Sequence, residues 1–257
     1  MQNSPADIVE IYHKYTQELN DKNREKRYDG KEHWYHASGA GSCSRKLYYE
    51  SVEKAKPSNP LDERTLRLLR LGTMVHDDFE KALHVYNTSI YNKYNKLGNK
   101  EKETKDKEKE IFKFHTEGEI TIKELNVRGF YDIVAEGEEV YLYDLKTCAS
   151  YSWKLKFGKK PFNTSIQYEL QLGTYGLAIQ EKFGRLDGMY LYYYNKDNSD
   201  MRPVSVPLLY VSRAYMFWKN VNDEHKQGLP QFRKGVSPVQ AWQCKYCQFL
   251  DHCNPPR

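Results

Sequence analysis

The sequence has no long hydrophobic run, and this absence limits the kind of protein that it can encode. Mean hydropathy is −0.87, and no apolar stretch approaches the roughly 20 residues that a membrane-spanning helix needs. The first residues, Met-Gln-Asn-Ser-Pro-Ala-Asp, lack the basic and apolar regions of a secretory signal peptide. We therefore expect a cytoplasmic protein with no membrane association, encoded by a cell or by a phage that acts inside one.

Cysteine, charge imbalance and repetition are scarce as well. Five cysteines, an odd number, argue against a disulfide framework in an intracellular chain. The 40 Lys and Arg residues and 35 Asp and Glu residues leave a formal net charge of +5, which permits a polyanionic partner without identifying one. The sequence shows no internal repeat and no clear linker, so its 257 residues predict a single domain over residues 1–257.

The order of the predicted elements is mixed α/β. Apolar residues at helical spacing predict helices over about residues 5–19, 62–86, 164–184 and 212–227. Extended patterns predict strands over about residues 112–125, 127–135, 140–147 and 189–195. We expect a central mixed sheet flanked by helices, an N-terminal helical extension over residues 1–35 and a cysteine-rich tail over residues 228–257.

The strongest chemical signal is the predicted hairpin over residues 129–147. Side chains alternate along a strand, so Asp144 and Lys146 project from the same face. A short turn with Gly137 folds the preceding strand back and brings Asp132 near Asp144. Carboxylates suit Mg²⁺ and Mn²⁺, which activate water and stabilise charge in phosphodiester cleavage. The hairpin predicts such a centre, with Lys146 orienting or deprotonating the water, although an exposed ion pair would share this short motif.

Two predicted helices add polar side chains to this hairpin. On the helix before it, Gly72 clears space one turn before His76, on the same side. On the helix after it, Gln171 and Tyr175 are four residues apart and face the same way, where they could meet a substrate. A lone helical histidine is more often structural, so the case for His76 depends on these partners.

Three of the five cysteines, Cys244, Cys247 and Cys253, fall within ten residues of the tail. A tetrahedral thiolate site needs a fourth ligand, and Cys43 is the first candidate. The rival fourth ligands are Cys148, His225 and His252. Completion by Cys43 would join the two ends of the domain, and four thiolates suit either Zn²⁺ or an iron–sulfur cluster. Unligated thiols are the plainer alternative.

Four short motifs, taken in order, resemble those of the PD-(D/E)XK nuclease superfamily and, more narrowly, of its RecB-like branch. They are Gly72-x-x-x-His76, Gly129-x-x-Asp132, Asp144-x-Lys146 and Gln171-x-x-x-Tyr175. The stretch Cys43-Ser-Arg-Lys-Leu-Tyr-Tyr and the tail cysteines are similar to those of its iron–sulfur members, the AddB subunits and the CRISPR adaptation nucleases. The resemblance runs from about residue 38 to residue 253. The charged insertion near residues 92–110 and the absence of a helicase motif depart from it.

The resemblance implies a restriction-endonuclease-like core and a role for each of these residues. His76, Asp132 and Asp144 would hold Mg²⁺ or Mn²⁺, and Lys146 would serve the attacking water. Gln171 and Tyr175 would position the DNA or the lysine. The resemblance also implies that a [4Fe-4S] cluster joins the two ends of the domain. Its ligands would be Cys43, Cys244, Cys247 and Cys253, and Cys148 would take no part.

The expected function is a metal-dependent exonuclease that prefers single-stranded DNA or free DNA ends, acting in recombination, repair or phage DNA processing. It would work alone or beside a separate helicase or recombination protein. The segment Trp153–Lys160 interleaves aromatic residues with four lysines, a combination that can stack bases and track phosphates. A structure-specific endonuclease and a non-catalytic, zinc-stapled nucleic-acid-binding scaffold are the alternatives. The complete set of two acids and a lysine argues against the scaffold.

Overall fold

The computed structural model describes residues 8–28, 33–94, 111–159, 166–235, 239 and 241–253 of the chain. Within these ranges the fold is mixed α/β, with one mixed sheet flanked by helices, which confirms the predicted fold class at that level. Most of the charged insertion near residues 92–110 lies outside the described residues, and so does Lys160.

The sheet has six strands. They are β1 (Tyr35–His36), β2 (Lys113–Ile122), β3 (Val127–Glu136), β4 (Val140–Cys148), β5 (Gly188–Asn195) and β6 (Met201–Val206). β2 runs antiparallel to β3 along one edge. Within the sheet, β4 pairs in parallel with β5, and β5 pairs antiparallel with β6. The predicted strands all form, whereas β1 and β6 were not predicted.

The second edge of β3 is shared by two strands. β1 pairs in parallel with the first two residues of β3, and β4 pairs antiparallel with residues 133–136. Within the described chain, residues 129–132 therefore have no ladder partner on this edge. The edge opens there, and its backbone and side chains are available for other contacts.

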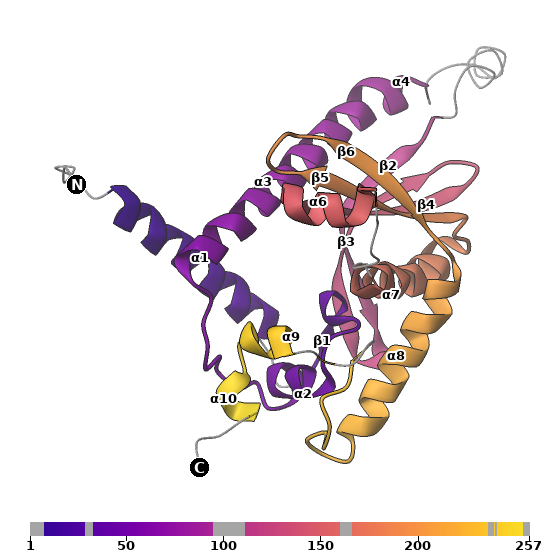
Figure 1. Cartoon of the computed structure of the whole chain (residues 1–257). Coiled ribbons are helices and arrows are strands. Elements are labelled where there is room, and N and C mark those ends of the chain that lie inside the picture. The colour runs from indigo at the N-terminus through magenta and orange to yellow at the C-terminus, as the bar shows by residue number, and fades with distance from the viewer. Residues whose placement is uncertain are drawn as a thin grey trace.

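Helices flank the sheet (Figure 1). They are α1 (Ile8–Tyr28), α2 (Ser44–Leu47), α3 (Glu63–Tyr86), α4 (Asn92–Tyr94), α6 (Ser150–Phe157), α7 (Ile166–Phe183), α8 (Leu209–His225), α9 (Ala241–Lys245) and α10 (Leu250–Cys253). α7 packs on the sheet, α8 packs on α7, and α3 contacts β2 and β4. No helix within the described ranges is long and apolar enough to cross a membrane.

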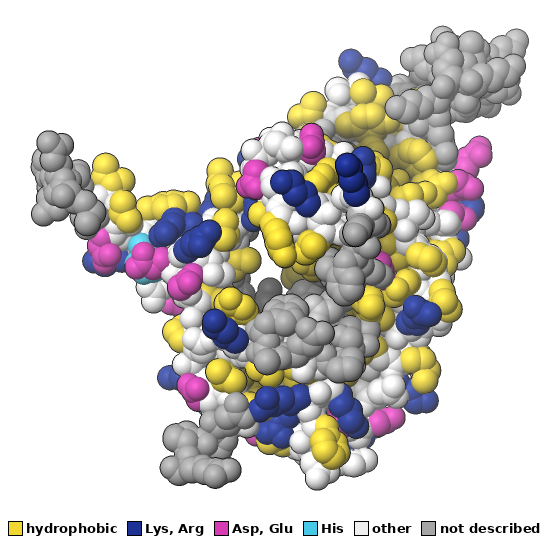
Figure 2. All heavy atoms as spheres, in the orientation of Figure 1, with side chains coloured by type: hydrophobic (Ala, Val, Ile, Leu, Met, Phe, Trp, Pro, Cys, Tyr) yellow, Lys and Arg dark blue, Asp and Glu magenta, His cyan; other side chains and the backbone are white. Residues whose placement is uncertain are grey.

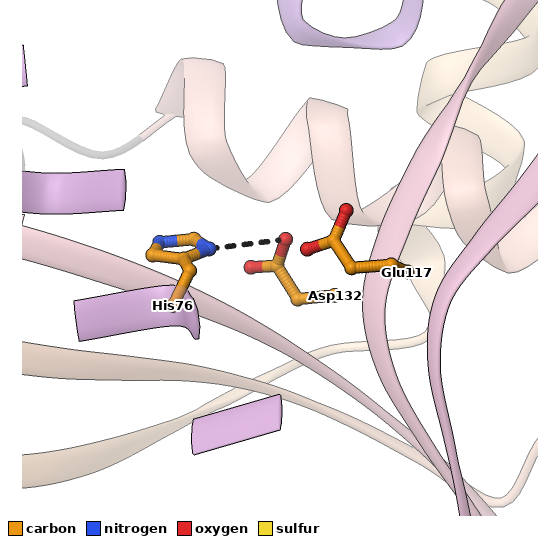
Figure 3. A group of neighbouring side chains, drawn as sticks. All are labelled: His76, Glu117 and Asp132. Atoms are coloured by element: carbon orange, nitrogen blue, oxygen red, sulfur yellow. Dashed lines mark ion pairs between the residues drawn. The ribbon is translucent and has the colours of Figure 1, made fainter. Parts of the chain in front are cut away.

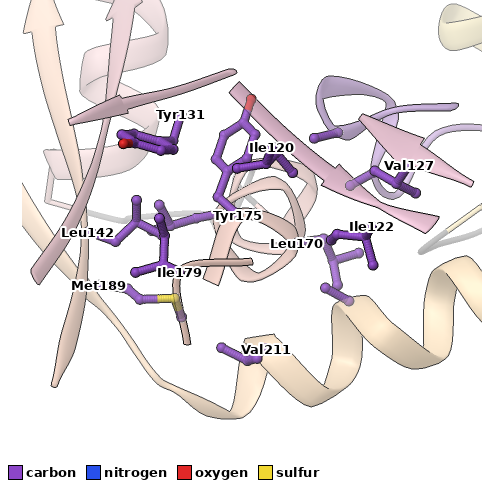
Figure 4. Close-up of a cluster of buried hydrophobic side chains, with 14 of the residues drawn as sticks. Ile120, Ile122, Val127, Tyr131, Leu142, Leu170, Tyr175, Ile179, Met189 and Val211 are labelled. Carbon is purple, nitrogen blue, oxygen red and sulfur yellow. The ribbon is translucent and has the colours of Figure 1, made fainter. Parts of the chain in front are cut away.

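The core lies between the sheet and α7 (Figure 4). Leu142 from β4, Met189 from β5 and Ile179 from α7 have no solvent exposure. Each such buried side chain stabilises the fold by about 1.5–3 kcal/mol relative to leaving it exposed. A Cβ atom on Gly173 would lie 2.1 Å from the Tyr210 carbonyl oxygen, so glycine lets α7 and α8 approach closely. This packing fixes α7, which carries two of the predicted site residues.

The tail returns to the N-terminal part of the chain, beside α2 (Figure 1). The Ser44 amide donates to the Lys234 carbonyl at 2.5 Å, and the Ser58 amide donates to the Gln248 carbonyl at 2.8 Å. Arg45 Nη1 donates to a further tail carbonyl at 2.8 Å. Backbone hydrogen bonds therefore hold the segment around Cys43 against the cysteine-rich tail.

Candidate active site

The open edge of β3 places Asp132 beside β4. The Leu145 amide donates a hydrogen bond to Asp132 Oδ2 at 2.6 Å, so the carboxylate replaces a missing ladder partner. Ile133 pairs with Tyr143, and the next position along both strands sets Asp132 opposite Asp144. The structure thus brings the two acids of the hairpin together.

Asp144 is fully buried and is held by a short polar network. Its Oδ2 lies 2.5 Å from Lys146 Nζ, and Gln171 Nε2 lies 3.5 Å from its Oδ1. Lys146 Nζ donates to Gln171 Oε1 at 3.1 Å, and Gln171 Nε2 donates to the Tyr175 hydroxyl at 2.9 Å. Gln171 thus bridges the acid, the lysine and the tyrosine and fixes their relative orientation.

Burial and neighbouring charges determine the protonation of this network. Burial raises the pKa of Asp144, and the Lys146 ammonium only partly offsets that effect. Burial alone would lower the pKa of Lys146, but the carboxylates of Asp144 and Asp132 outweigh it and raise the pKa. In the metal-free protein Lys146 therefore keeps its proton at neutral pH and is a hydrogen-bond donor.

His76 reaches the acids from α3. Its Nδ1 lies 3.5 Å from Asp132 Oδ1. Burial lowers the pKa of His76, but the Asp132 carboxylate outweighs burial and raises it. The imidazole is thus placed to share a cation with Asp132 once it gives up its proton.

The glycines of the motifs allow these close approaches. A Cβ atom on Gly72 would lie 3.0 Å from Thr147 Oγ1, so glycine lets α3 pack against β4. A Cβ atom on Gly129 would lie 3.0 Å from the Ala37 Cβ and 3.3 Å from the Tyr175 ring. Both positions have little room for a side chain, so the motifs place small residues where elements of the site meet.

Glu117, a residue that the sequence analysis did not single out, joins His76 and Asp132. One ligand atom from each of the three lies within 4.8 Å of the other two. Figure 3 shows the three side chains pointing toward one another, His76 from α3 and the two acids from neighbouring strands. An imidazole nitrogen and two carboxylates are suitable ligands for a divalent ion, so this group could hold one.

The backbone places Glu117 directly across from Asp132. The pairs on either side of this position are in register, but Glu117 and Asp132 are not themselves paired. Glu117 has φ 48°, in the left-handed region that is unusual for a residue other than glycine. Burial raises the pKa of Glu117 to about 7, and the charge of Asp132 adds to this shift. Two carboxylates are therefore held close together at a cost that a bound cation would relieve.

All four outer cysteines line one cavity of about 320 Å³. Cys43 comes from the segment before α2, and Cys244, Cys247 and Cys253 come from the tail. Cys43 lies about 200 positions before the three tail cysteines in the sequence, and the fold brings them to one cavity.

Two arginines stand beside the thiols of this cavity. Arg233 Nη1 lies 3.5 Å from Cys244 Sγ. The Cys253 sulfur raises the pKa of Arg233. Burial lowers the pKa of Arg45, but the same sulfur outweighs burial and raises it. The cavity thus places two cationic groups beside its sulfur atoms, while burial raises the pKa of the Cys247 thiol.

The three rival ligands lie elsewhere, since none of them lines the cavity. Cys148 ends β4. His225 is buried between α8, β1 and α2, where the Tyr35 hydroxyl lies 2.7 Å from its Nδ1 and the Ser44 carbonyl 3.0 Å from its Nε2. His252 Nε2 lies 2.7 Å from a backbone carbonyl. Cys43, the first candidate for the fourth ligand, is the one that lines the cavity with the three tail cysteines.

The basic aromatic segment at Trp153 lies largely in helix α6. Trp153 and Phe157 of α6 pack together with ring centroids 4.6 Å apart. Phe157 also packs edge-on against Tyr193 of β5, at 5.4 Å. These aromatic rings contribute to packing, so they do not offer the free stacking platforms that the sequence suggested.

Comparison with known proteins identifies the family. The model of the PD-(D/E)XK nuclease superfamily matches residues 36–254. The crystal structure of SSO0001 is 18% identical, with 95% of this chain and 94% of that chain covered and a TM-score of 0.49. A "Putative exonuclease" from Eubacterium rectale is 16% identical, with 100% and 95% covered and a TM-score of 0.49. No curated protein matches the sequence. Because the family match spans all four motifs and most of the length of this chain, the chain belongs to the PD-(D/E)XK nuclease superfamily.

Proposed function

We propose that this chain is a divalent-metal-dependent deoxyribonuclease that degrades single-stranded DNA from its ends. The group of His76, Glu117 and Asp132, next to the ion pair of Asp144 and Lys146, supports the proposal most directly. Nucleases of this superfamily hydrolyse nucleic acids and use divalent metals. The preference for DNA, for single strands and for ends rests on the resemblance of the motifs to RecB-like nucleases.

The side chains fit a hard divalent cation. His76, Glu117 and Asp132 present ligand atoms to one point, and Asp144 is adjacent to Asp132 across the two strands. Mg²⁺ or Mn²⁺ held by these residues would supply Lewis acidity and lower the pKa of a bound water. The acids are ionised when a cation offsets their mutual repulsion.

Lys146 orients the attacking water and stabilises the charge that develops on the phosphate. Its ammonium is held in place by Asp144 at 2.5 Å and by Gln171 at 3.1 Å. Because its pKa is raised, it donates hydrogen bonds rather than accepting a proton. A preorganised donor of this kind costs no reorganisation during the reaction. Gln171 and Tyr175 fix the position of the lysine.

We also propose that Cys43, Cys244, Cys247 and Cys253 hold a [4Fe-4S] cluster. The shared cavity and the two arginines support a set of four thiolates. The choice of an iron–sulfur cluster over Zn²⁺ rests on the resemblance of the cysteine pattern to the iron–sulfur members of the RecB-like branch.

The surface is compatible with a polyanionic substrate. Lys and Arg side chains gather over the lower part of the face in Figure 2, where Figure 1 places α2, and the middle of this face is hollowed. We propose that DNA processing in recombination, repair or phage replication is the setting. A separate helicase or recombination protein would supply the single strands.

The test is degradation of linear single-stranded DNA with Mg²⁺ or Mn²⁺ by anaerobically purified protein. The wild type should degrade the linear strand, and Asp144→Asn, which removes one metal-binding charge, should not. A closed circular single strand is the matched substrate. If the circle is cleaved equally well, the protein is an endonuclease and not an exonuclease. If neither substrate is cleaved, the proposal that the protein is a nuclease is wrong.

A further inference from the structure

Tyr168 presents an exposed aromatic ring at the catalytic lysine. The ring lies over Lys146, with 4.9 Å between Nζ and the ring centroid. Tyr168 is 41% exposed, although it lies beside groups that are almost fully buried. One face of the ring is turned toward the ammonium, and the exposed part of the side chain is open to a ligand.

The position of Tyr168 on α7 fixes its relation to the reacting groups. It lies one turn before Gln171, which holds the Lys146 ammonium at 3.1 Å, and two turns before Tyr175. A phosphate that reaches Lys146 and Asp144 therefore lies close to the Tyr168 ring. The base attached to the neighbouring sugar is the nearest flat apolar group that the substrate can offer.

Three other aromatic side chains near this part of the sheet are already engaged. Trp153 and Phe157 pack on each other, and Tyr193 is buried. Among the described residues, Tyr168 makes no aromatic ring contact of its own, and its ring is matched only by the Lys146 charge. An exposed ring at a charged site is a ready surface for base stacking.

We propose that Tyr168 stacks on the nucleobase beside the scissile phosphate and thereby selects unpaired bases. This inference rests on the proposed nuclease function. A base in a duplex is already paired and stacked, so it must leave its neighbours before it can cover the ring. A single-stranded base meets no such cost. Tyr168 thus makes strand preference a property of the active site itself.

A purely positioning role for Tyr168 makes different predictions. A cation–π contact that only steadies Lys146 would act on every substrate alike, whatever base is present. A stacking contact disappears when the base disappears. Substrates with one abasic site, moved by one position at a time from each end of a single strand, separate the two roles.

The experiment compares kcat/KM for wild type, Tyr168→Ala and Tyr168→Phe on this abasic series and on the intact strand. In the wild type, one abasic position should lower kcat/KM by about 5-fold to 150-fold, the range expected for one stacked base. On the intact strand, Tyr168→Ala should have a kcat/KM lower than that of the wild type by the same factor. Placing the abasic site at the sensitive position should lower the kcat/KM of Tyr168→Ala no further. Tyr168→Phe, which keeps the ring, should behave as the wild type.

Tyr12→Ala is the matched control, because Tyr12 is also 41% exposed but lies on α1. It should match the wild type, and melting temperatures should confirm that every variant folds. The stacking role is overturned if Tyr168→Ala slows all substrates equally, the abasic ones included, or slows none. Failure of the nuclease itself is distinct, because the wild type would then cleave no strand.

Discussion

At the scale of single residues, the buried pair of Asp144 and Lys146 links stability to catalysis. An ion pair in the interior is costly to break, because the remaining charge stays buried without a partner. Asp144 side-chain exposure is 1% and that of Lys146 is 15%. In the proposed mechanism the same pair is both catalytic and structural, so a substitution at either residue should affect both activity and stability.

Lys146→Ala should abolish cleavage and keep DNA binding, because it removes a transition-state contact rather than a phosphate anchor. It should also lower the free energy of unfolding by about 3–5 kcal/mol in chelator, because Asp144 is left unpaired. Mg²⁺ should restore part of this loss. Urea denaturation with and without Mg²⁺ measures it, with exposed Lys154→Ala as control. Unchanged activity would remove Lys146 from the mechanism.

Glu117→Gln should weaken Mn²⁺ binding by at least about tenfold, because it removes a charged ligand. Mutation of a residue that only hydrogen-bonds to a metal ligand already lowers metal affinity by about tenfold or more. The same change should raise the melting temperature of the metal-free protein, because it ends the repulsion between Glu117 and Asp132. Titration calorimetry and thermal unfolding provide the two readouts.

The control for that change is Glu119→Gln, an exposed carboxylate two residues along β2. It should leave both quantities unchanged. Identical Mn²⁺ affinity in the wild type and Glu117→Gln would exclude Glu117 from the metal site.

At the scale of elements, His225 joins three parts of the fold. It extends from α8, accepts a hydrogen bond from Tyr35 of β1 and donates to the Ser44 carbonyl at the start of α2. These contacts require a proton on Nε2, since a carbonyl can only accept, and in the neutral imidazole Nδ1 then accepts from the Tyr35 hydroxyl. Protonation would force a second proton onto the nitrogen that faces the tyrosine.

Burial lowers the pKa of His225 from its ordinary value of 6.5. Just below pH 6.5 the unfolded chain therefore binds a proton that the folded protein does not, so stability falls as pH drops through this range. His225→Gln should flatten this part of the profile of unfolding free energy between pH 8 and pH 5. Exposed His84→Gln should retain the wild-type slope, and equal slopes in both variants would refute the assignment.

The sequence predicted the elements with strong patterns and missed those whose patterns are interrupted. β3, β4, β5, α3 and α7 form close to their predicted bounds, because apolar alternation and helical spacing are unbroken there. β6 was missed because Pro203 lies within it, and proline argues against an interior strand. An edge strand tolerates it, since one side of β6 has no partner among the described strands.

The residues of the candidate site also differ in whether the sequence could predict them. Asp132, Asp144, Lys146 and His76 stand in short motifs, so residue type and spacing pointed to them. Glu117 has no such motif, and its role depends on the register of β2 against β3. That register follows from the turn at Asn126, which has φ 52°. Spacing within one strand cannot show which residue faces Asp132 across the next.

At the scale of the whole molecule, the cysteine cavity connects the ends of the described chain. Cys247→Ser should lower both iron content and melting temperature, because metal binding at a structural site contributes folding free energy. Cys148→Ser is the matched control, since Cys148 lies outside the cavity, and it should keep full iron. A Cys247→Ser protein with wild-type iron and melting temperature would show that these thiols hold no cluster.

The cavity also has a consequence for the synthesis of the protein. Cys43 precedes Cys253 by 210 residues, so a ribosome that adds about 5–20 residues per second finishes the tail on the order of 10–40 s after Cys43 is made. Lys146 follows Cys43 by 103 residues, so for about the second half of that interval the acids, the histidine and the lysine are already translated, while Cys253 is not. A nascent chain must therefore complete the cysteine-rich tail before the cavity can close.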